Sequence, residues 1–275
     1  MNALRRAIPQ PVKAVLKPLY LRMLDLSDFS ARRRDMIPPR SLDFVGGTHY
    51  REVGLEFRDL FIRYGGLKPT DRVLDVGSGI GRMAAPLTSY LAEGGEYQGF
   101  DIVKKGVAWS QKHITTRYPN FHFVHSDVKN KFYNPDGVYE ASSYRFPYED
   151  GSFDFVFLTS VFTHMFAADM ENYMREISRV LKKGGTSFIT MFLLNEESQK
   201  LIQQGRSTQN FVHKLKGCVT ADPDNPEASL AFDEGYVRAA FDKSNLSIRE
   251  PIHRGAWCGR KEFLSYQDIV IATKD

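Results

Sequence analysis

Three acidic residues, each at the end of an apolar run, are the side chains of this sequence best placed to bind a nucleoside. They are Asp75, Asp101 and Asp127. The first is followed by a glycine-rich turn and a helix-like stretch, and the turn reads Gly77-Ser78-Gly79-Ile80-Gly81. Glycines let the backbone take positive φ, and the first N–H groups of a helix bind anions, so this stretch is typical of a cradle for a nucleotide-like ligand. The turn alone is a weak signal, because dinucleotide-dependent dehydrogenases carry a close relative of it.

The spacing of the acids predicts a role for each part of a nucleoside. Asp101 lies twenty residues beyond Gly81, the interval at which a carboxylate can accept both hydroxyls of a ribose. Asp127 is placed to accept from the exocyclic amino group of a base, and Ile102 and Val128 would offer apolar faces to an adenine ring. A single Asp at a strand end is as often a turn or helix cap. Three such acids at the ends of successive strands, together with the glycine turn, favour one shared ligand site.

The elements that must position these acids alternate between strand and helix. Apolar and β-branched runs predict strands at 73–76, 97–101, 121–125, 153–160 and 186–193. Helical spacing and glycine stops predict helices over 53–64, 80–91, 103–117 and 168–181. This alternation is typical of an α/β fold in which helices cover both faces of a parallel sheet. Ligands of such sheets bind outside the carboxyl ends of the strands, so we expect the three acids to face one crevice.

The C-terminal part follows a different pattern. Residues 232–244 have helical spacing, and residues 246–254 and 265–273 have the composition of strands. The link between these two strands is a loop, too short for another helical crossover. We therefore expect an antiparallel pair at the end of the chain.

Length and composition favour one medium-sized domain. The chain has 275 residues, of which 42% are hydrophobic, enough for a sizeable core. Its two cysteines, Cys218 and Cys258, lie forty residues apart without a metal-ligand spacing, so a reducing compartment and a cytoplasmic location are expected. No run of about eighteen apolar residues predicts a membrane span, and the start lacks the apolar core of a secretory signal.

Residues 1–40 form a basic segment ahead of the remaining domain, 41–275. Nine Lys or Arg against three Asp give this segment a balance of +6, so the other 235 residues sum to −2 within the net charge of +4. Enzymes that grip nucleic acid over a broad face have a basic body, which this charge distribution disfavours. Apolar residues recur at helical spacing around Pro18, so the segment is amphipathic. Packing on its own domain or a partner is favoured over binding to an anionic membrane face or mitochondrial import, and all three stay open.

Taken in order, these motifs resemble those of the class I S-adenosylmethionine-dependent methyltransferases. The stretches that match are 73–81, 99–101, 126–128, 146–156 and 176–185. The resemblance covers about residues 50–275, and it implies a seven-stranded Rossmann-like sheet whose last strand inserts antiparallel. It also implies S-adenosylmethionine as the cofactor. The expected cofactor-binding residues are Asp75, Gly77, Ser78, Gly79, Gly81, Asp101, Ile102, Asp127, Val128 and Thr159.

His164 is the candidate catalytic base. It follows the fourth strand in Ser160-Val161-Phe162-Thr163-His164, and in this fold that position faces the methyl group. A neutral imidazole can take the proton of an attacking hydroxyl. The alternative is a histidine that hydrogen-bonds the backbone and shapes the pocket, and the sequence leaves the two interpretations level.

Absent motifs narrow the acceptor. DNA amino-methylating enzymes of this fold carry a polar-Pro-Pro-aromatic motif after the fourth strand, where this chain has Leu158-Thr159-Ser160-Val161. Methylation of a base at C5 needs a thiolate nucleophile, and neither cysteine lies near that strand. Nucleic acid is therefore disfavoured as a partner. No metal site is expected, although scattered carboxylates leave a metal-assisted mechanism open.

Two insertions, 129–145 and 195–231, are expected to build the acceptor pocket. The first is rich in Tyr, Asn and Ser, which on loops at a ligand edge suit a carbohydrate or another polar small molecule. Both could instead be plain surface loops. The candidate substrate-binding residues are Arg82, Tyr133, Tyr144, Arg145, His253 and Trp257, with a surface ion pair as the alternative for Arg82.

The sequence thus predicts an S-adenosylmethionine-dependent enzyme that methylates a hydroxyl of a small molecule or glycan. One rival hypothesis is an RNA or protein methyltransferase that grips its substrate with residues 1–40. Others are a nicotinamide-dependent dehydrogenase, against which the antiparallel last strand argues, and a cofactor-binding regulator without turnover. The identity of the acceptor and the oligomeric state stay open.

Overall fold

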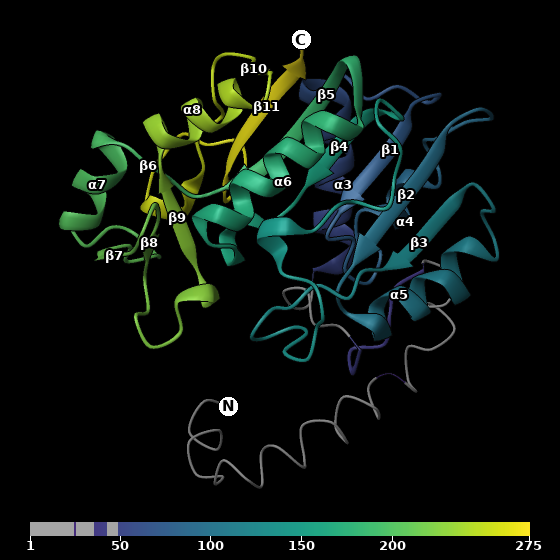
Figure 1. The fold of residues 1–275 in the computed structure, drawn as a ribbon, viewed down its shortest axis with the longest axis horizontal. Helices are drawn as coiled ribbons and strands as arrows, with labels where there is room; N and C mark the ends of the chain where they lie inside the picture. The colour runs from purple at the N-terminus through teal and green to yellow at the C-terminus, as the bar shows by residue number, and fades with distance from the viewer. Residues whose placement is uncertain (1–24, 26–35, 43–48) are drawn as a thin grey trace, which may run out of the picture.

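The computed structural model describes residue 25, residues 36–42 and residues 49–275 (Figure 1). The prediction of a basic amphipathic segment over residues 1–40 falls, apart from Asp25 and residues 36–40, outside the described residues. Among the described residues no helix is both long and apolar enough to cross a membrane.

A seven-stranded sheet forms the centre of the described chain, in the order β10-β11-β5-β4-β1-β2-β3. Its strands are β1 (Arg72–Val76), β2 (Glu96–Asp101), β3 (Phe121–His125), β4 (Phe153–Leu158), β5 (Leu181–Met191), β10 (Leu246–Ile248) and β11 (Asp268–Lys274). β1 to β5 pair in parallel, and β11 pairs antiparallel with both β5 and β10. The predicted α/β fold with an antiparallel last strand is confirmed. Strand order reverses between β1 and β4, which places the loops after these strands side by side.

The helices of the described residues are α3 (Tyr50–Leu60), α4 (Ala84–Leu87), α5 (Lys104–Ser110), α6 (Ala167–Val180), α7 (Glu196–Gln203) and α8 (Glu234–Lys243). α3 and α5 each continue into one π-helical turn, Phe61–Gly65 and Gln111–Thr115. With these turns included, the predicted helices over 53–64, 103–117 and 168–181 are confirmed to within a few residues.

The helix predicted over 80–91 is wrong in length, since α4 is a single turn. Side chains beyond it compete for its carbonyl groups. The Thr88 hydroxyl donates to the Ala85 carbonyl at 2.7 Å, and the Ser89 hydroxyl donates to the Pro86 carbonyl at 2.9 Å. Such local bonds offer the backbone an alternative to a further helical turn.

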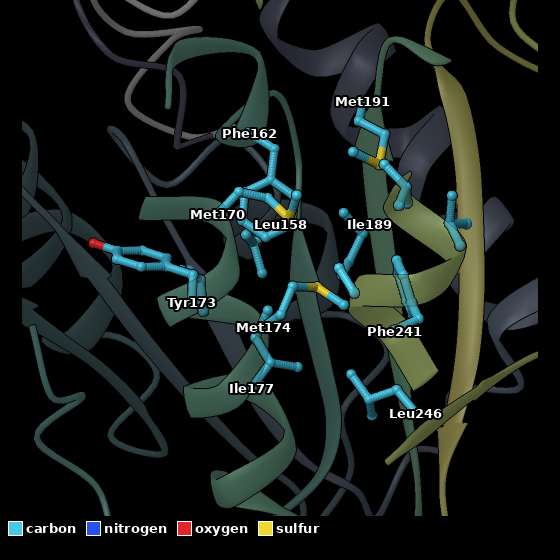
Figure 2. Close-up of a cluster of buried hydrophobic side chains, with 14 of the residues drawn as sticks. Leu158, Phe162, Met170, Tyr173, Met174, Ile177, Ile189, Met191, Phe241 and Leu246 are labelled. Atoms are coloured by element: carbon cyan, nitrogen blue, oxygen red, sulfur yellow. The ribbon is translucent and has the colours of Figure 1, made fainter. Parts of the chain in front are cut away.

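The two faces of the sheet carry two separate apolar clusters, because successive strand residues point to opposite sides. Val73 of β1 and Phe155 of β4 pack with α3, α4 and α5. Their neighbours Leu74 and Val156 pack with α6 and α8. Figure 2 shows the second cluster, in which side chains of α6 and α8 converge on β4 and β5. Both faces of the sheet are thus covered, as a parallel sheet requires.

Residues 195–231, predicted as an insertion, contain regular structure. They contain α7 and most of a four-stranded sheet in the order β6-β9-β8-β7, of which β6 precedes α7 in the chain. Its strands are β6 (Leu193–Leu194), β7 (His213–Lys214), β8 (Val219–Thr220) and β9 (Leu230–Asp233). A third apolar cluster, which includes Phe192, Phe211 and Trp257, holds this part together. The small sheet lies at the side of α8 and β11 in Figure 1.

Two predicted strand boundaries are wrong. β5 begins at Leu181, five residues before the predicted start, because the turn after α6 already belongs to the strand. The strand predicted over 246–254 ends at Ile248. Pro251 has no N–H to donate, so pairing with β11 resumes only where the amide of His253 donates to the carbonyl of Ile269 at 3.1 Å.

Candidate functional site

A cavity of about 550 Å³ lies at the carboxyl ends of β1, β2 and β4, where the strand order reverses. The glycine-rich turn after β1 forms one wall, and the end of β2 forms another. Further walls come from the loop after β3, the turn after β4 and the start of α6. Elements far apart in the sequence therefore share one ligand-sized space at the place where open α/β sheets bind ligands.

The glycine-rich turn is held by the end of β2. The amides of Gly77 and Ser78 both donate to the carbonyl of Phe100 at 2.9 Å. Gly77 has φ 84°, and a Cβ at this position would lie 2.4 Å from Cγ2 of Val161. Only glycine fits such a conformation and such a contact. The buried hydroxyl of Ser78 has no hydrogen-bond partner, so it is available to a ligand.

Asp75 offers one carboxylate oxygen to the cavity. Its Oδ2 accepts a hydrogen bond from the Tyr97 hydroxyl at 2.5 Å, whereas its buried Oδ1 has no partner. Burial raises the pKa of Asp75 to about 8, the hydrogen bond from Tyr97 opposes this rise, and the charge of Asp101 adds to it. A ligand group that is cationic or donates a hydrogen bond would supply a partner for Oδ1 of Asp75.

Asp101 joins the glycine turn to the end of β2. Its Oδ2 accepts from the amide of Gly79 and its Oδ1 from the amide of Val103, both at 2.7 Å. Burial raises the pKa of Asp101 to about 6 although both bonds favour the charged form. Each carboxylate oxygen retains a second lone pair. Asp101 lines the cavity, so it can still accept from a ligand hydroxyl.

Asp127 does not join the other two acids. It is not among the residues that line the cavity, and its Oδ1 accepts from the side-chain amide of Asn134 at 2.9 Å. The loop after β3 folds back, so that the amides of Val138 and Tyr139 donate to the Asp127 carbonyl. The expectation that three acids face one crevice is therefore wrong for Asp127, while its neighbour Val128 does line the cavity.

Most of the other residues expected to contact the cofactor line the cavity, and one does not. Gly77, Ser78, Gly79, Ile102 and Thr159 line the cavity. Gly81 does not. It has φ 80°, and a Cβ there would lie 2.6 Å from Cδ1 of Ile114, so its role is to let the turn pack against the segment after α5.

His164 lines the cavity at the end of a short helical turn, Phe162–His164, that follows β4. Its Nδ1 lies 2.8 Å from the carbonyl oxygen of Glu227. A carbonyl only accepts, so Nδ1 carries the proton of the neutral ring and Nε2 is left as an acceptor. Burial lowers the pKa of His164, and the bond to the carbonyl opposes the shift without cancelling it. The ring is therefore neutral near pH 7.

Of the expected substrate-binding residues, Arg82 and Tyr133 line the cavity, and four others do not. The Tyr144 hydroxyl donates to Ser126 at 2.7 Å, and Arg145 is exposed and pairs with Asp150 at 3.2 Å. The ring of His253 packs against the ring of Tyr64, with 4.8 Å between the ring centroids.

Trp257 is buried in the third cluster, and its Nε1 donates to Asp268 at 2.6 Å. Contacts with other parts of the chain thus hold all four side chains away from the lining of this cavity, so the structure gives no support to their predicted role in substrate binding.

Several lining residues were not among those expected. They include Lys129, Asn130, Met165, Asp169, Tyr173, Glu227 and Tyr266. Asp169 and Tyr173 are four residues apart on a predicted helix, so helical spacing could have placed them on one side. Nothing in the sequence marks that side as facing a cavity. Glu227 comes from the predicted insertion 195–231, which the structure brings against His164.

Neither cysteine belongs to the site. Cys218 and Cys258 are buried, burial raises the pKa of both thiols, and neither lines the cavity. In the part of the chain that the structure describes, no group of His, Cys, Asp and Glu is arranged to hold a metal ion.

Comparisons with known proteins find similarity to methyltransferases. Residues 74–189 match the family model described as "Methyltransferase domain". The chain is 29% identical to sterol 24-C-methyltransferase erg6 of Schizosaccharomyces pombe, over 51% of this chain and 33% of that protein. It is also 29% identical to phosphoethanolamine N-methyltransferase 2 of Caenorhabditis elegans, over 76% of this chain and 46% of that protein. The chain therefore spans between about a third and about a half of the length of these curated relatives.

The fold has solved counterparts. A SAM-dependent methyltransferase structure from Methanosarcina mazei superposes with a TM-score of 0.52 at 22% identity. The superposition covers 78% of this chain and 96% of that one. At this identity the likeness is one of fold.

Proposed function

Because this chain carries a domain of the class I S-adenosylmethionine-dependent methyltransferase family, we propose that it transfers the methyl group of S-adenosylmethionine to a hydroxyl of a small molecule or glycan. The observation that carries the proposal is the shared cavity. Both the glycine turn and a neutral histidine, His164, line it. The two buried cysteines suit a reducing compartment, so we expect the enzyme to act in the cytoplasm.

The residues at the glycine turn fit the cofactor of this family. Asp75 Oδ1 and the Ser78 hydroxyl are buried polar atoms without partners, and both residues line the cavity. Asp75 would hold the amino group of the methionine part, and Asp101 the ribose hydroxyls. Ile102 and Val128 would flank the base. When bound, the cofactor supplies a methyl group on a positively charged sulfur, which is already activated for transfer.

The protein's contribution to the transfer is to orient the acceptor, exclude water and receive a proton. Nδ1–H of His164 donates to the Glu227 carbonyl, which fixes the ring and leaves Nε2 to take the proton from the acceptor hydroxyl. Met83, Val161 and Met165 line the cavity and help to keep water from the reacting atoms.

The acceptor atom is the part of the proposal that needs a direct test. The two curated relatives are named for methylation of carbon and of nitrogen. We propose oxygen because a hydroxyl acceptor needs a neutral base to take its proton, and His164 is such a base. The rival hypothesis of an RNA or protein methyltransferase that grips its substrate with residues 1–40 makes two predictions. Deletion of these residues should strongly reduce activity, and the intact protein should bind RNA in a salt-sensitive manner.

The test combines binding with product analysis. Calorimetry should detect binding of S-adenosylmethionine and of its demethylated product, S-adenosylhomocysteine. Cell-extract fractions incubated with methyl-labelled cofactor should then give a product labelled on oxygen, as identified by mass spectrometry. Label found on nitrogen or carbon alone would contradict the proposed acceptor atom, and no heat with either compound would contradict the whole proposal.

Substitution of His164 tests the base. His164→Ala should lower kcat by about 10²- to 10⁴-fold, because a positioned base contributes about that much. Cofactor affinity should stay unchanged. In the unsubstituted enzyme, kcat/KM should fall as the pH drops through the lowered pKa of His164, below its ordinary value of 6.5. Near-full turnover by His164→Ala would instead assign this histidine a structural role.

A further inference from the structure

The residues that line the cavity form two groups of different chemistry. The glycine turn, Asp75 and Asp101 are expected to contact the cofactor. A second group, called the acceptor half, consists of Tyr133, His164, Asp169, Tyr173 and Glu227. The side chains of this second group indicate which kind of acceptor the enzyme binds.

Two carboxylates of the acceptor half have no counter-ion among the described residues. Asp169 uses one oxygen, Oδ2, to accept from the amide of Phe166 at 3.2 Å, and forms no ion pair there. Glu227 is held through its backbone carbonyl, which accepts from His164, and its carboxylate forms neither a hydrogen bond nor an ion pair with that part of the chain. Burial raises the pKa of Asp169, and the charges of Glu227 and Glu140 raise it further. Like charges therefore lie near one another in this half.

Tyr173 supplies an independent observation. Its side chain is 4% exposed, yet its hydroxyl has no hydrogen-bond partner in the described chain. Figure 2 shows the hydroxyl pointing away from the apolar cluster into which the ring packs. Tyr173 lies one helical turn beyond Asp169 on α6, and both line the cavity. A tyrosine that is almost fully buried, and whose hydroxyl faces a cavity without a partner in the protein, is placed to bind a polar ligand group there.

The two cationic residues that line the cavity in the described chain, Arg82 and Lys129, each directly follow a segment that is expected to contact the cofactor. Arg82 follows the glycine turn, and its charge acts on Asp75. Lys129 is exposed and directly follows Val128, next to the expected position of the base. The acceptor half thus retains an excess of negative charge. The ring of Tyr133, which packs edge-on against His164 at 5.7 Å, adds an aromatic side chain of the kind that attracts cations.

We propose that the acceptor carries a positively charged amino group, which binds between the carboxylates of Asp169 and Glu227 with the Tyr173 hydroxyl as a further partner. The acceptor class is a small amino alcohol or an amino sugar, whose hydroxyl is then held within reach of His164. This inference rests on the proposed methyl transfer and names its substrate class. A neutral polyol could also hydrogen-bond to two carboxylates, but it would leave their charge uncompensated.

The test compares matched pairs of probes that differ in charge. Glucosamine is compared with glucose, and ethanolamine with ethylene glycol, by ligand-observed NMR on the complex with S-adenosylhomocysteine. The amine of at least one pair should bind about tenfold more tightly than its neutral partner, as expected for a charge-assisted hydrogen bond. Asp169→Asn/Glu227→Gln should remove this preference, since both substitutions keep the shape and remove the charge.

Controls separate charge from folding and from cofactor binding. Glu93→Gln removes an exposed carboxylate outside the cavity and should keep the preference. Glu227→Gln alone leaves the bond between Asp169 and the start of α6 intact and should reduce the preference partly. Tyr173→Phe should weaken binding of the amine, although its ring can still pack into the apolar cluster. Calorimetry with S-adenosylhomocysteine should give the same affinity for all variants.

Three results would overturn the inference. They are equal binding of amines and neutral probes, a preference that persists in Asp169→Asn/Glu227→Gln, and no binding of any amine at millimolar concentration. If S-adenosylhomocysteine still binds in these cases, the proposed methyl transfer stands and the substrate class is wrong. If the unsubstituted protein does not bind S-adenosylhomocysteine, it is the proposed function that fails.

Discussion

At the scale of single residues, Asp75 is the group whose ionisation the fold controls most clearly. It is 1% exposed, one of its oxygens accepts from Tyr97, and the other has no partner. Burial raises its pKa to about 8, so most molecules carry a protonated Asp75 at pH 7. A cation bound beside it would favour the charged form and lower this pKa.

Cofactor binding should therefore release protons. Calorimetry at pH 7 in buffers of different ionisation enthalpy should show release of nearly one proton per molecule of S-adenosylmethionine bound. The number should fall toward zero well above pH 8, where Asp75 is already ionised in the free protein. Asp75→Asn should bind the cofactor weakly and release none. Release that is unchanged in this variant would show that another group loses the proton.

The same pKa shift predicts how stability depends on pH. The folded pKa of Asp75 lies above the unfolded value of 3.8, so the folded state binds more protons between these two values. The contribution of Asp75 to stability must then decline as the pH rises through that window. The Tm of Asp75→Asn relative to the unsubstituted protein should increase from about pH 4 to pH 8. A constant difference would contradict the raised pKa.

At the scale of elements, glycines decide the shape of the turn that follows β1. Gly81 has φ 80°, and a Cβ there would lie 2.6 Å from Cδ1 of Ile114 and 2.9 Å from the Ser110 hydroxyl. Both neighbours are fully buried, so they have little room to move. Gly66, after α3, has nearly the same φ of 77°, but a Cβ at that position would have no neighbouring atom within 4 Å.

This pair separates backbone strain from steric contact. Gly66→Ala should destabilise the protein by about 1 kcal/mol, the cost of the left-handed conformation alone. Gly81→Ala should cost about 1–3 kcal/mol more, because it also crowds a packed interior. Urea unfolding measures both values. Equal losses would show that the side chains of Ile114 and Ser110 move aside without cost.

At the scale of the whole molecule, the strand order makes the site. β1 and β4 are neighbours although the residues that pair, such as Val73 and Phe155, are far apart in the chain. Their loops carry the glycine turn and His164, and the connection between β8 and β9 adds Glu227. The cavity exists only when all of these parts are folded together, so a ligand that fills it binds the native state selectively.

S-Adenosylhomocysteine should accordingly raise the Tm of the whole domain. At a concentration of about one hundred times Kd, the native state gains about 2.7 kcal/mol. For a chain of this size that corresponds to a rise of roughly 5 °C or more. Gly77→Ala, which places a Cβ 2.4 Å from Val161 in the turn itself, should show little or no rise. Differential scanning fluorimetry measures the rise in Tm of both proteins. An equal rise in Gly77→Ala would show that the ligand binds outside this turn.

The sequence by itself determined the order of the strands along the chain, the covering of the sheet by helices, the glycine turn and the places of Asp75, Asp101 and His164. These features depend on short-range chemistry: apolar spacing, backbone freedom at glycine, and residues that directly follow a strand. The tertiary structure decided which other side chains reach the cavity. Asp127 is turned to Asn134 by a folded-back loop, Trp257 is buried against Asp268, and Glu227 meets His164 across 63 positions of the chain. Such placements depend on how loops pack against distant elements, and no local pattern encodes that packing.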